Sequence, residues 1–183
     1  MRSLAGQLLV ASRHLRDTNF RQSVVLMLEH TEQGALGVVL NRPSERTIRE
    51  VWEAVEADPC DNDDFMMIGG PVPGPLIALH DSEPLGEKTI LTGVYMSMQR
   101  SVLDQLVREP GQTVRIYHGN AGWASGQLEG EMKAGGWLTA KATARDVFSD
   151  HEKLWKDVSQ RIGLSIMLPG ARPDQLPGDA SMN

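Results

Sequence analysis

The sequence is poor in cysteine, in positive charge and in long apolar runs, and each shortage excludes a class of protein. Its single cysteine, Cys60, has no partner for an internal disulfide, which is typical of a reducing compartment. Lys and Arg total 18 against 24 Asp and Glu, so the broad basic surface of a nucleic-acid-binding protein is not expected. No apolar run approaches the ~20 residues that a membrane-spanning helix needs. We therefore expect a cytoplasmic protein without a membrane or nucleic-acid partner.

The motifs of common enzymes and metal sites are also missing. The nucleophile elbow G-x-S-x-G is out of register around Ser125, and no P-loop lysine follows the glycines. The five histidines are isolated from one another, and the acidic segment Asp58–Asp64 lacks the glycine and the closing acid of a calcium loop. We predict no cofactor, no metal and no catalytic residue, and a solvated acidic loop.

Length and composition predict one domain. A chain of 183 residues, of which 40% are hydrophobic and 23% charged, can bury one substantial core. From Pro169 onward, proline, glycine and aspartate remove any packing period. We expect a single domain over residues 1–168 and a disordered tail over residues 169–183.

Short apolar runs predict strands. Gln7–Ala11, Val24–His30 and Leu36–Leu40 are rich in Val and Leu, and Gln33-Gly34 between the last two marks a hairpin. These runs lack polar alternation, which is typical of strands that are covered on both faces. Later runs predict further strands at Phe65–Ile68, Pro75–His80, Thr89–Leu91, Thr113–His118 and Gly136–Ala142.

Capping residues and apolar spacing predict helices between these strands. Thr47 and Glu50 form a capping box, and Trp52 in the helix that follows is expected to anchor it to the sheet. Ser97 is expected to cap a second long helix, and Ser149 with Glu152 to cap the last one.

The segment Tyr117–Trp137 is the most informative. It places three glycines, a tryptophan and a polar helix start directly after a strand, a geometry in which proteins build binding pockets. We interpret Gly119–Gly126 as a turn whose backbone N–H groups could hold an anion, with a purely structural turn as the alternative. A short helix over 127–133 follows it.

A second candidate site is Asn41-Arg42-Pro43, where a buried strand exits. Its amide and guanidinium suit a carboxylate, a phosphate or a base. The alternative is structural: Asn41 closes the turn and Arg42 pairs with a local carboxylate.

Several of these motifs together resemble the YqgE/AlgH family of bacterial proteins. In chain order they are Phe20 with Ser23–His30, Gly34–Pro43, Gly69–Val72, Leu79-His80 and Gly119–Glu129. The resemblance covers about residues 4–163. It implies an α+β fold in which a bifurcated, mainly antiparallel sheet curls into a pseudo-barrel flanked by helices. It implies no established enzymatic activity; one branch of the family is linked to regulation of alginate synthesis, and the label of transcriptional regulator rests on that link.

The motifs and the resemblance together predict a set of ligand-binding residues. They are Asn41, Arg42, Gly70, Pro71, His80, Gly119, Asn120, Gly122, Trp123 and Gln127. Asn120 stands where the family commonly has tyrosine, and asparagine still suits a turn.

We predict a non-enzymatic binding or regulatory protein that recognises a protein or a small anionic ligand. The alternative is an enzyme that uses His80 or Glu129 as acid or base. Both hypotheses require the Asn41 loop and the Trp123 bend to share one concave surface.

Overall fold

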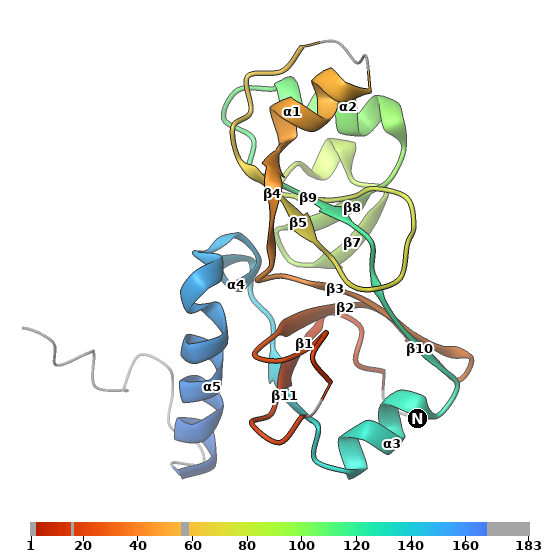
Figure 1. Cartoon of the computed structure of the whole chain (residues 1–183), viewed down its shortest axis with the longest axis vertical. Coiled ribbons are helices and arrows are strands. Elements are labelled where there is room, and N and C mark those ends of the chain that lie inside the picture. Colours follow the sequence, from red (N-terminus) through yellow and green to blue (C-terminus); the bar gives the residue numbers. More distant parts are fainter. Residues whose placement is uncertain (1–2, 16, 56–58, 168–183) are drawn as a thin grey trace, which may run out of the picture.

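A computed structural model describes residues 3–15, 17–55 and 59–167 of the chain (Figure 1). Within these residues the chain forms two β-sheets, with helices around them. The tail predicted over residues 169–183 lies outside the described residues.

The first sheet has five strands in the order β10-β3-β2-β1-β11, and every neighbouring pair is antiparallel. These strands are β1 (Gln7–Ala11), β2 (Val24–Thr31), β3 (Gly34–Val39), β10 (Ala121–Ala124) and β11 (Trp137–Lys141). The hairpin predicted at Gln33-Gly34 is confirmed, because β2 and β3 pair in register from Thr31 and Gly34 back to Val25 and Val39, with one bulge between Met27 and Glu29.

The second sheet has six strands in the order β4-β5-β9-β6-β8-β7. These strands are β4 (Pro43–Thr47), β5 (Phe65–Ile68), β6 (Ile77–His80), β7 (Lys88–Leu91), β8 (Val94–Ser97) and β9 (Val114–His118). The neighbours are antiparallel except for β5 and β9, which run parallel.

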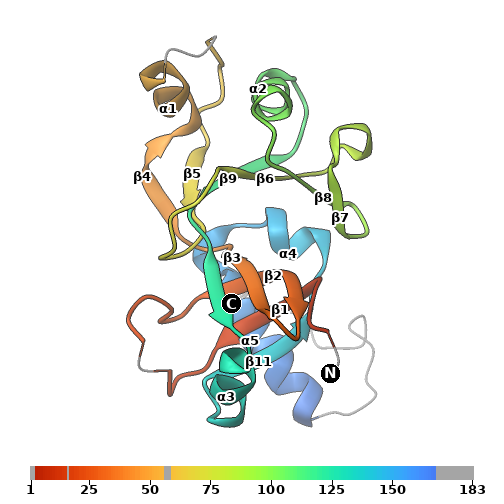
Figure 2. The same cartoon turned by 90° about the vertical axis from the view of Figure 1, so that its right-hand side faces the viewer.

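Helices flank the two sheets. The helices are α1 (Ile48–Ala54), α2 (Arg100–Arg108), α3 (Gln127–Lys133), α4 (Ala144–Phe148) and α5 (His151–Met167), with a 3-10 turn at Glu83–Leu85. Of these, α4 lies between the two sheets (Figure 2). Helices α1 and α2 cover the far side of the second sheet, α3 lies beyond the first sheet, and α5 runs along the side of the first sheet (Figures 1 and 2).

The main hydrophobic core lies between the two sheets. It takes Leu26 and Leu28 from β2, Leu79 and Tyr117 from the second sheet, and Val158 from α5. The alternate residues of β2 belong to another cluster, on the α3 side of the first sheet. A third cluster joins the second sheet to α1 and α2. Strand β2 is therefore covered on both faces, which confirms the interpretation of its unbroken apolar run.

The α+β class, the mainly antiparallel pairing and the flanking helices are confirmed. The two sheets do not close into a barrel; they pack against each other across the shared core. This shared core supports the single domain expected over residues 1–168, which stays a prediction.

The capping box at Thr47 is confirmed. The backbone N–H of Thr47 donates to Glu50 Oε2 at 2.8 Å, and Thr47 Oγ1 accepts from the Glu50 N–H at 3.2 Å. The cap predicted at Ser97 is wrong, because Ser97 is a fully buried residue of β8. The cap of α2 is Gln99, and the N–H of Gln99 donates to the carboxylate of Glu87.

The box predicted at Ser149 and Glu152 is also wrong. Ser149 ends α4, whose capping box is formed by Thr143 and Asp146, and the Glu152 N–H donates to Asp150 Oδ1. The segment Gly119–Gly126, which we interpreted as a turn, contains the strand β10. Its pairing with β3 was not visible in the local sequence.

Candidate functional site

Three sequence-distant motifs meet where the chain passes between the two sheets. We call this place the sheet junction and define it by Asn41, Arg42, Gly69–Val72 and Gly119–Gly122. Figure 1 shows β3 leading to β4 and β9 leading to β10 across it. Main-chain bonds join the segments: the Val39 N–H donates to Gly69 O at 2.8 Å, and the Gly69 N–H donates to His118 O at 2.8 Å.

Two glycines of the junction are required by close backbone contact. Gly70 has φ 153°, and a Cβ on it would lie 2.3 Å from the backbone carbonyl of Asn120. Gly119 has φ 69°, and its Cβ would lie 2.6 Å from Gly70 O. Beside them, Val72 and Asn120 exchange two main-chain bonds, at 3.0 and 2.9 Å. Side chains are excluded here because two backbones touch.

Asn41 and Arg42 hold the loop that precedes β2. Asn41 Oδ1 accepts from the Val24 N–H at 2.9 Å, and its Nδ2 donates to Gln22 O at 2.9 Å. Arg42 Nη2 donates to Arg21 O at 3.3 Å. Burial lowers the pKa of the Arg42 guanidinium, and the carboxylate of Asp17 offsets part of this shift. Both side chains are half-buried and engaged with this loop.

Trp123 lies in the core between β10 and α3. Its side chain faces α3, the residue is 5% exposed, and its ring stacks on Phe20 at 6.0 Å and meets the edge of Trp137 at 5.9 Å. Its Nε1 donates to Glu131 Oε2 at 3.0 Å, and Trp137 Nε1 donates to the same oxygen at 2.8 Å. The flat apolar surface expected of Trp123 is thus used for packing.

Gln127 also links β10 to Glu131 of α3. Its Oε1 accepts from the Ala124 N–H at 3.1 Å, and its Nε2 donates to Glu131 Oε1 at 3.0 Å. The sequence interpretation missed Glu131, although its position four residues after Gln127 on one helix was a usable signal. The N–H groups of Ala124 and Asn120 are bonded within the chain, so neither is free to hold an anion at this turn.

His80 is fully buried on β6 and lies apart from the junction motifs. Its Nε2 lies 3.1 Å from Ser97 Oγ, and that hydroxyl donates to Leu85 O at 2.6 Å. The hydroxyl proton is therefore used elsewhere, so His80 Nε2 donates to Ser97. Burial lowers the pKa of His80, and Asp81 is first among the groups that oppose this shift.

Glu129 is paired with a histidine of the first sheet. Its Oε1 accepts from His30 Nε2 at 3.0 Å, while His30 Nδ1 accepts from the Leu4 N–H at 3.1 Å. A hydrogen bond with its own backbone and the bond from His30 lower the pKa of the Glu129 carboxyl. Both ring nitrogens of His30 are occupied, so the pair ties α3 and the N-terminal segment to β2.

The structure thus brings together most of the predicted residues. Those at the sheet junction are Asn41, Arg42, Gly70, Pro71, Gly119, Asn120 and Gly122. Trp123 faces α3 and connects to the junction through Phe20 and the loop that Asn41 holds, and Gln127, the first residue of α3, is bonded to Ala124 of β10. His80 is buried elsewhere in the second sheet.

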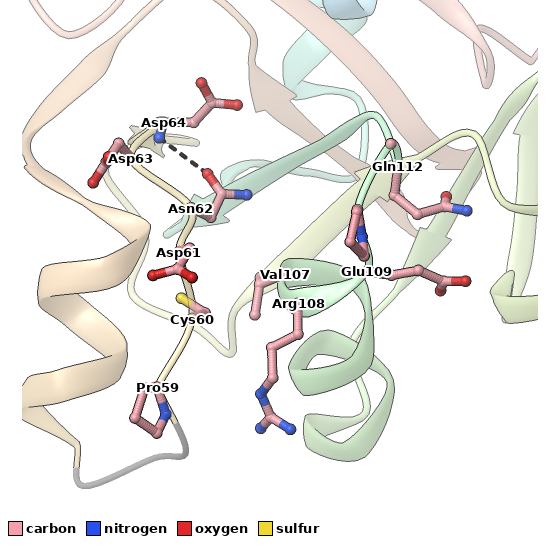
Figure 3. Close-up of a pocket in the computed structure, with 12 residues that line it drawn as sticks. Pro59, Cys60, Asp61, Asn62, Asp63, Asp64, Val107, Arg108, Glu109 and Gln112 are labelled. Atoms are coloured by element: carbon pink, nitrogen blue, oxygen red, sulfur yellow. Dashed lines mark hydrogen bonds between the residues drawn. The ribbon is translucent and has the colours of Figure 1, made fainter.

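A hollow of about 550 Å³ lies between the acidic loop and the end of α2 (Figure 3). Its lining includes Cys60 and Asp61 on one side and Val107 and Arg108 on the other. The loop caps α1, because the Arg49 N–H donates to Asn62 O at 2.9 Å. Asp58 of the predicted acidic segment lies outside the described residues.

A smaller hollow of about 320 Å³ lies at the tip of the β2–β3 hairpin. It is lined by Glu29, Thr31, Gln33, Gly34, Ala35, Leu36 and Trp123. Neither hollow is lined by both Asn41 and Trp123. In the ranges 3–15, 17–55 and 59–167, no group of three or more His, Cys, Asp or Glu could hold a metal ion, and no helix is long and apolar enough to cross a membrane.

The chain is similar to uncharacterised bacterial proteins over almost its whole length. A UPF0301 protein from Chlorobium luteolum is 38% identical over 185 residues, covering 97% of this chain and 95% of that protein. A UPF0301 protein from Myxococcus xanthus is 38% identical over 170 residues, covering 90% and 93%.

Solved structures show the same fold. The solution structure of the AlgH protein from Pseudomonas aeruginosa matches with a TM-score of 0.74 and 33% identity, over 93% of this chain and 95% of that one. A crystal structure of protein DIP2367 from Corynebacterium diphtheriae matches in fold with a TM-score of 0.71 at 24% identity, over 88% and 87%. The family model described as AlgH-like matches residues 8–167, and the chain therefore belongs to the AlgH-like family.

Proposed function

We propose that this chain is a non-enzymatic binding protein that recognises another protein through the sheet junction. The observation that carries the proposal is the convergence of three sequence-distant motifs on one exposed, rigid surface. Pro71, Val72 and Gly122 are exposed there, and Val72 is 43% exposed. An apolar side chain on a backbone fixed by main-chain contacts binds a partner with little loss of conformational entropy.

The alternatives have weaker support. For an anionic ligand, the Asn120 and Ala124 N–H groups are already bonded, and Arg42 is engaged by the loop before β2. For an enzyme, neither His80 nor Glu129 lines the acidic-loop hollow or the hairpin-tip hollow, and each is bonded to another side chain. Our proposal places the protein in the cytoplasm, in keeping with its single cysteine, and in a regulatory role, as the family resemblance implies.

A capture experiment with two matched valine variants tests the proposal. Val72→Arg places a charge on the junction surface, whereas Val55→Arg places the same charge at the end of α1, where Val55 is 52% exposed. The purified full chain and both variants are immobilised separately. The sets of proteins that each of the three captures are then compared after crosslinking. We expect a partner that Val72→Arg loses and Val55→Arg retains.

Thermal unfolding establishes that both variants are folded. A partner that Val72→Arg captures as well as the wild type would contradict the proposal. So would a thermal shift with nucleotides, sugar phosphates or organic acids that occurs without any protein partner, because that result supports the anionic-ligand hypothesis.

A further inference from the structure

Strand β10 is the last strand of the first sheet. It pairs with β3 on one side, and among the described residues no strand of this sheet follows it on the other side. Within the described ranges, Val72 is the one residue that pairs with that open side, through an isolated antiparallel bridge with Asn120. The chain itself therefore shows that this edge accepts an extended segment.

The direction of the backbone groups along β10 follows from alternation. In an antiparallel pair, every second residue directs its N–H and C=O away from the partner strand. The Asn120 N–H and C=O bond to Val72, and the Ala124 N–H bonds to the Gln127 side chain, so these residues face away from β3. Gly122 lies between them, and its N–H and C=O point to the open side in the same way.

The edge at Gly122 lacks a guarding side chain. Exposed edge strands are normally guarded by lysine, proline or a bulge, whereas β10 presents the exposed residues Gly122 and Ala124. A Cβ at Gly122 would meet nothing closer than Val72 Cγ2 at 3.9 Å. Because Gly122 has no side chain, its cross-strand neighbour Leu36 stays half-buried and lines the hairpin-tip hollow with Glu29.

We infer that an extended segment of another protein adds to this sheet at the open edge of β10, next to Val72. Main-chain bonds to Gly122 would supply binding, and an apolar side chain over Gly122 and Leu36 would supply selectivity. The inference rests on the proposed function and specifies how the partner binds.

A second copy of this chain fits the edge poorly. Antiparallel self-pairing centred on Gly122 would set Ala124 of the copy opposite Asn120. The N–H and C=O of Asn120 are already used by Val72. A separate peptide that ends before Asn120 can pair with Gly122 without displacing that bridge.

Hydrogen exchange on the free protein tests the geometry without any partner. The Gly122 amide is expected to exchange at nearly the rate of an unprotected glycine. The amides of Ala121 and Trp123, which face β3, are expected to be protected. A Gly122 amide as protected as these two neighbours would overturn the inference.

Random linear peptides displayed on phage then serve as the probe. Gly122→Pro removes the outward N–H without touching the pairing with β3, since an edge strand tolerates proline where its N–H faces solvent. Gly122→Ala keeps the N–H and is the matched control. Selected peptides are expected to slow hydrogen exchange at the Gly122 amide. They should bind Gly122→Ala as tightly as the wild type and Gly122→Pro at least about tenfold more weakly.

The outcomes separate this inference from the proposed function. Peptides or a captured partner that depend on Val72 but bind Gly122→Pro fully would leave the proposed function standing and overturn strand addition. Selection of no peptide at the junction, or a concentration-dependent dimer that Gly122→Pro abolishes, would overturn the assignment of a separate protein as the occupant.

Discussion

The carboxylate of Glu131 accepts the indole N–H of Trp137 at 2.8 Å, and the same oxygen accepts that of Trp123 at 3.0 Å. One side chain of α3 thus satisfies two tryptophans whose rings are buried against Phe20. Hydrogen bonds to a charged acceptor are stronger than neutral ones, and a buried donor without a partner costs about 1–3 kcal/mol. This makes Glu131 the polar centre of the cluster between α3 and the first sheet.

We predict that Glu131→Leu lowers the free energy of unfolding by about 2–4 kcal/mol, because it leaves two indole N–H groups without an acceptor. Glu131→Gln keeps an acceptor oxygen and should cost clearly less. Urea unfolding followed by tryptophan fluorescence measures both. Equal losses in the two variants would show that packing, rather than the two hydrogen bonds, determines the effect.

Trp52 joins α1 to α2 and gives a second prediction. Its Nε1 donates to Asp104 Oδ1 at 2.8 Å, the side chain is 1% exposed, and the Arg100 guanidinium lies 5.7 Å from its ring centre. Trp52→Ala should cost about 3–5 kcal/mol, because it removes a large buried ring. Trp52→Phe keeps most of the apolar contact and should cost less. Thermal and urea unfolding check this order, and a Trp52→Ala variant as stable as Trp52→Phe would refute it.

The sequence predicted those elements whose signals are local. The hairpin at Gln33-Gly34 and the capping box at Thr47 depend on residues a few positions apart, and both are confirmed. Strand β10 was missed because its partner β3 lies more than 80 positions earlier in the chain, and its glycines suggested a turn. Ser97 was wrongly assigned to a helix cap. Its bonds to His80 and Leu85 come from strand pairing and chain folding, which the local sequence does not show.

The sequence singled out the motifs of the sheet junction but did not show how they are arranged. The motifs at Asn41, Gly70 and Gly119 do meet, but through backbone contact and loop anchoring that no short window of sequence displays. Trp123 was expected on a surface because glycines surround it. The structure buries its ring, since its side chain faces α3 and Trp137 while the exposed Gly122 faces the opposite side.

Tyr117 gives a third prediction, in which a substitution raises the stability of the protein. Its ring lies in the core between the sheets, fully buried, and among the described residues its hydroxyl has no hydrogen-bond partner. Burial raises the pKa of this phenol well above its usual value. Tyr117→Phe removes the unpaired hydroxyl and should raise the free energy of unfolding by about 1 kcal/mol. Tyr95→Phe, at a half-buried tyrosine of β8, is the control and should change stability little. Urea unfolding that shows Tyr117→Phe to be destabilised would mean that the hydroxyl has a partner.

His80 gives the fourth prediction, which concerns pH. Its pKa is lowered by burial from the ordinary value of 6.5, so between the folded-state pKa and about 6.5 the unfolded chain binds more protons than the folded one. The contribution of His80 to stability is therefore complete above about pH 6.5 and is lost as pH falls through this window. Stability measured by urea unfolding from pH 8 to pH 5 should decline on the acid side.

Two glutamine variants isolate this effect. His80→Gln retains a donor toward Ser97 and cannot take up a proton, so it should flatten the acid side of the profile. His118→Gln changes an exposed histidine of β9 and should leave the profile as in the wild type. If both variants follow the wild-type profile between pH 8 and pH 5, His80 does not take up its proton on unfolding and the prediction is wrong.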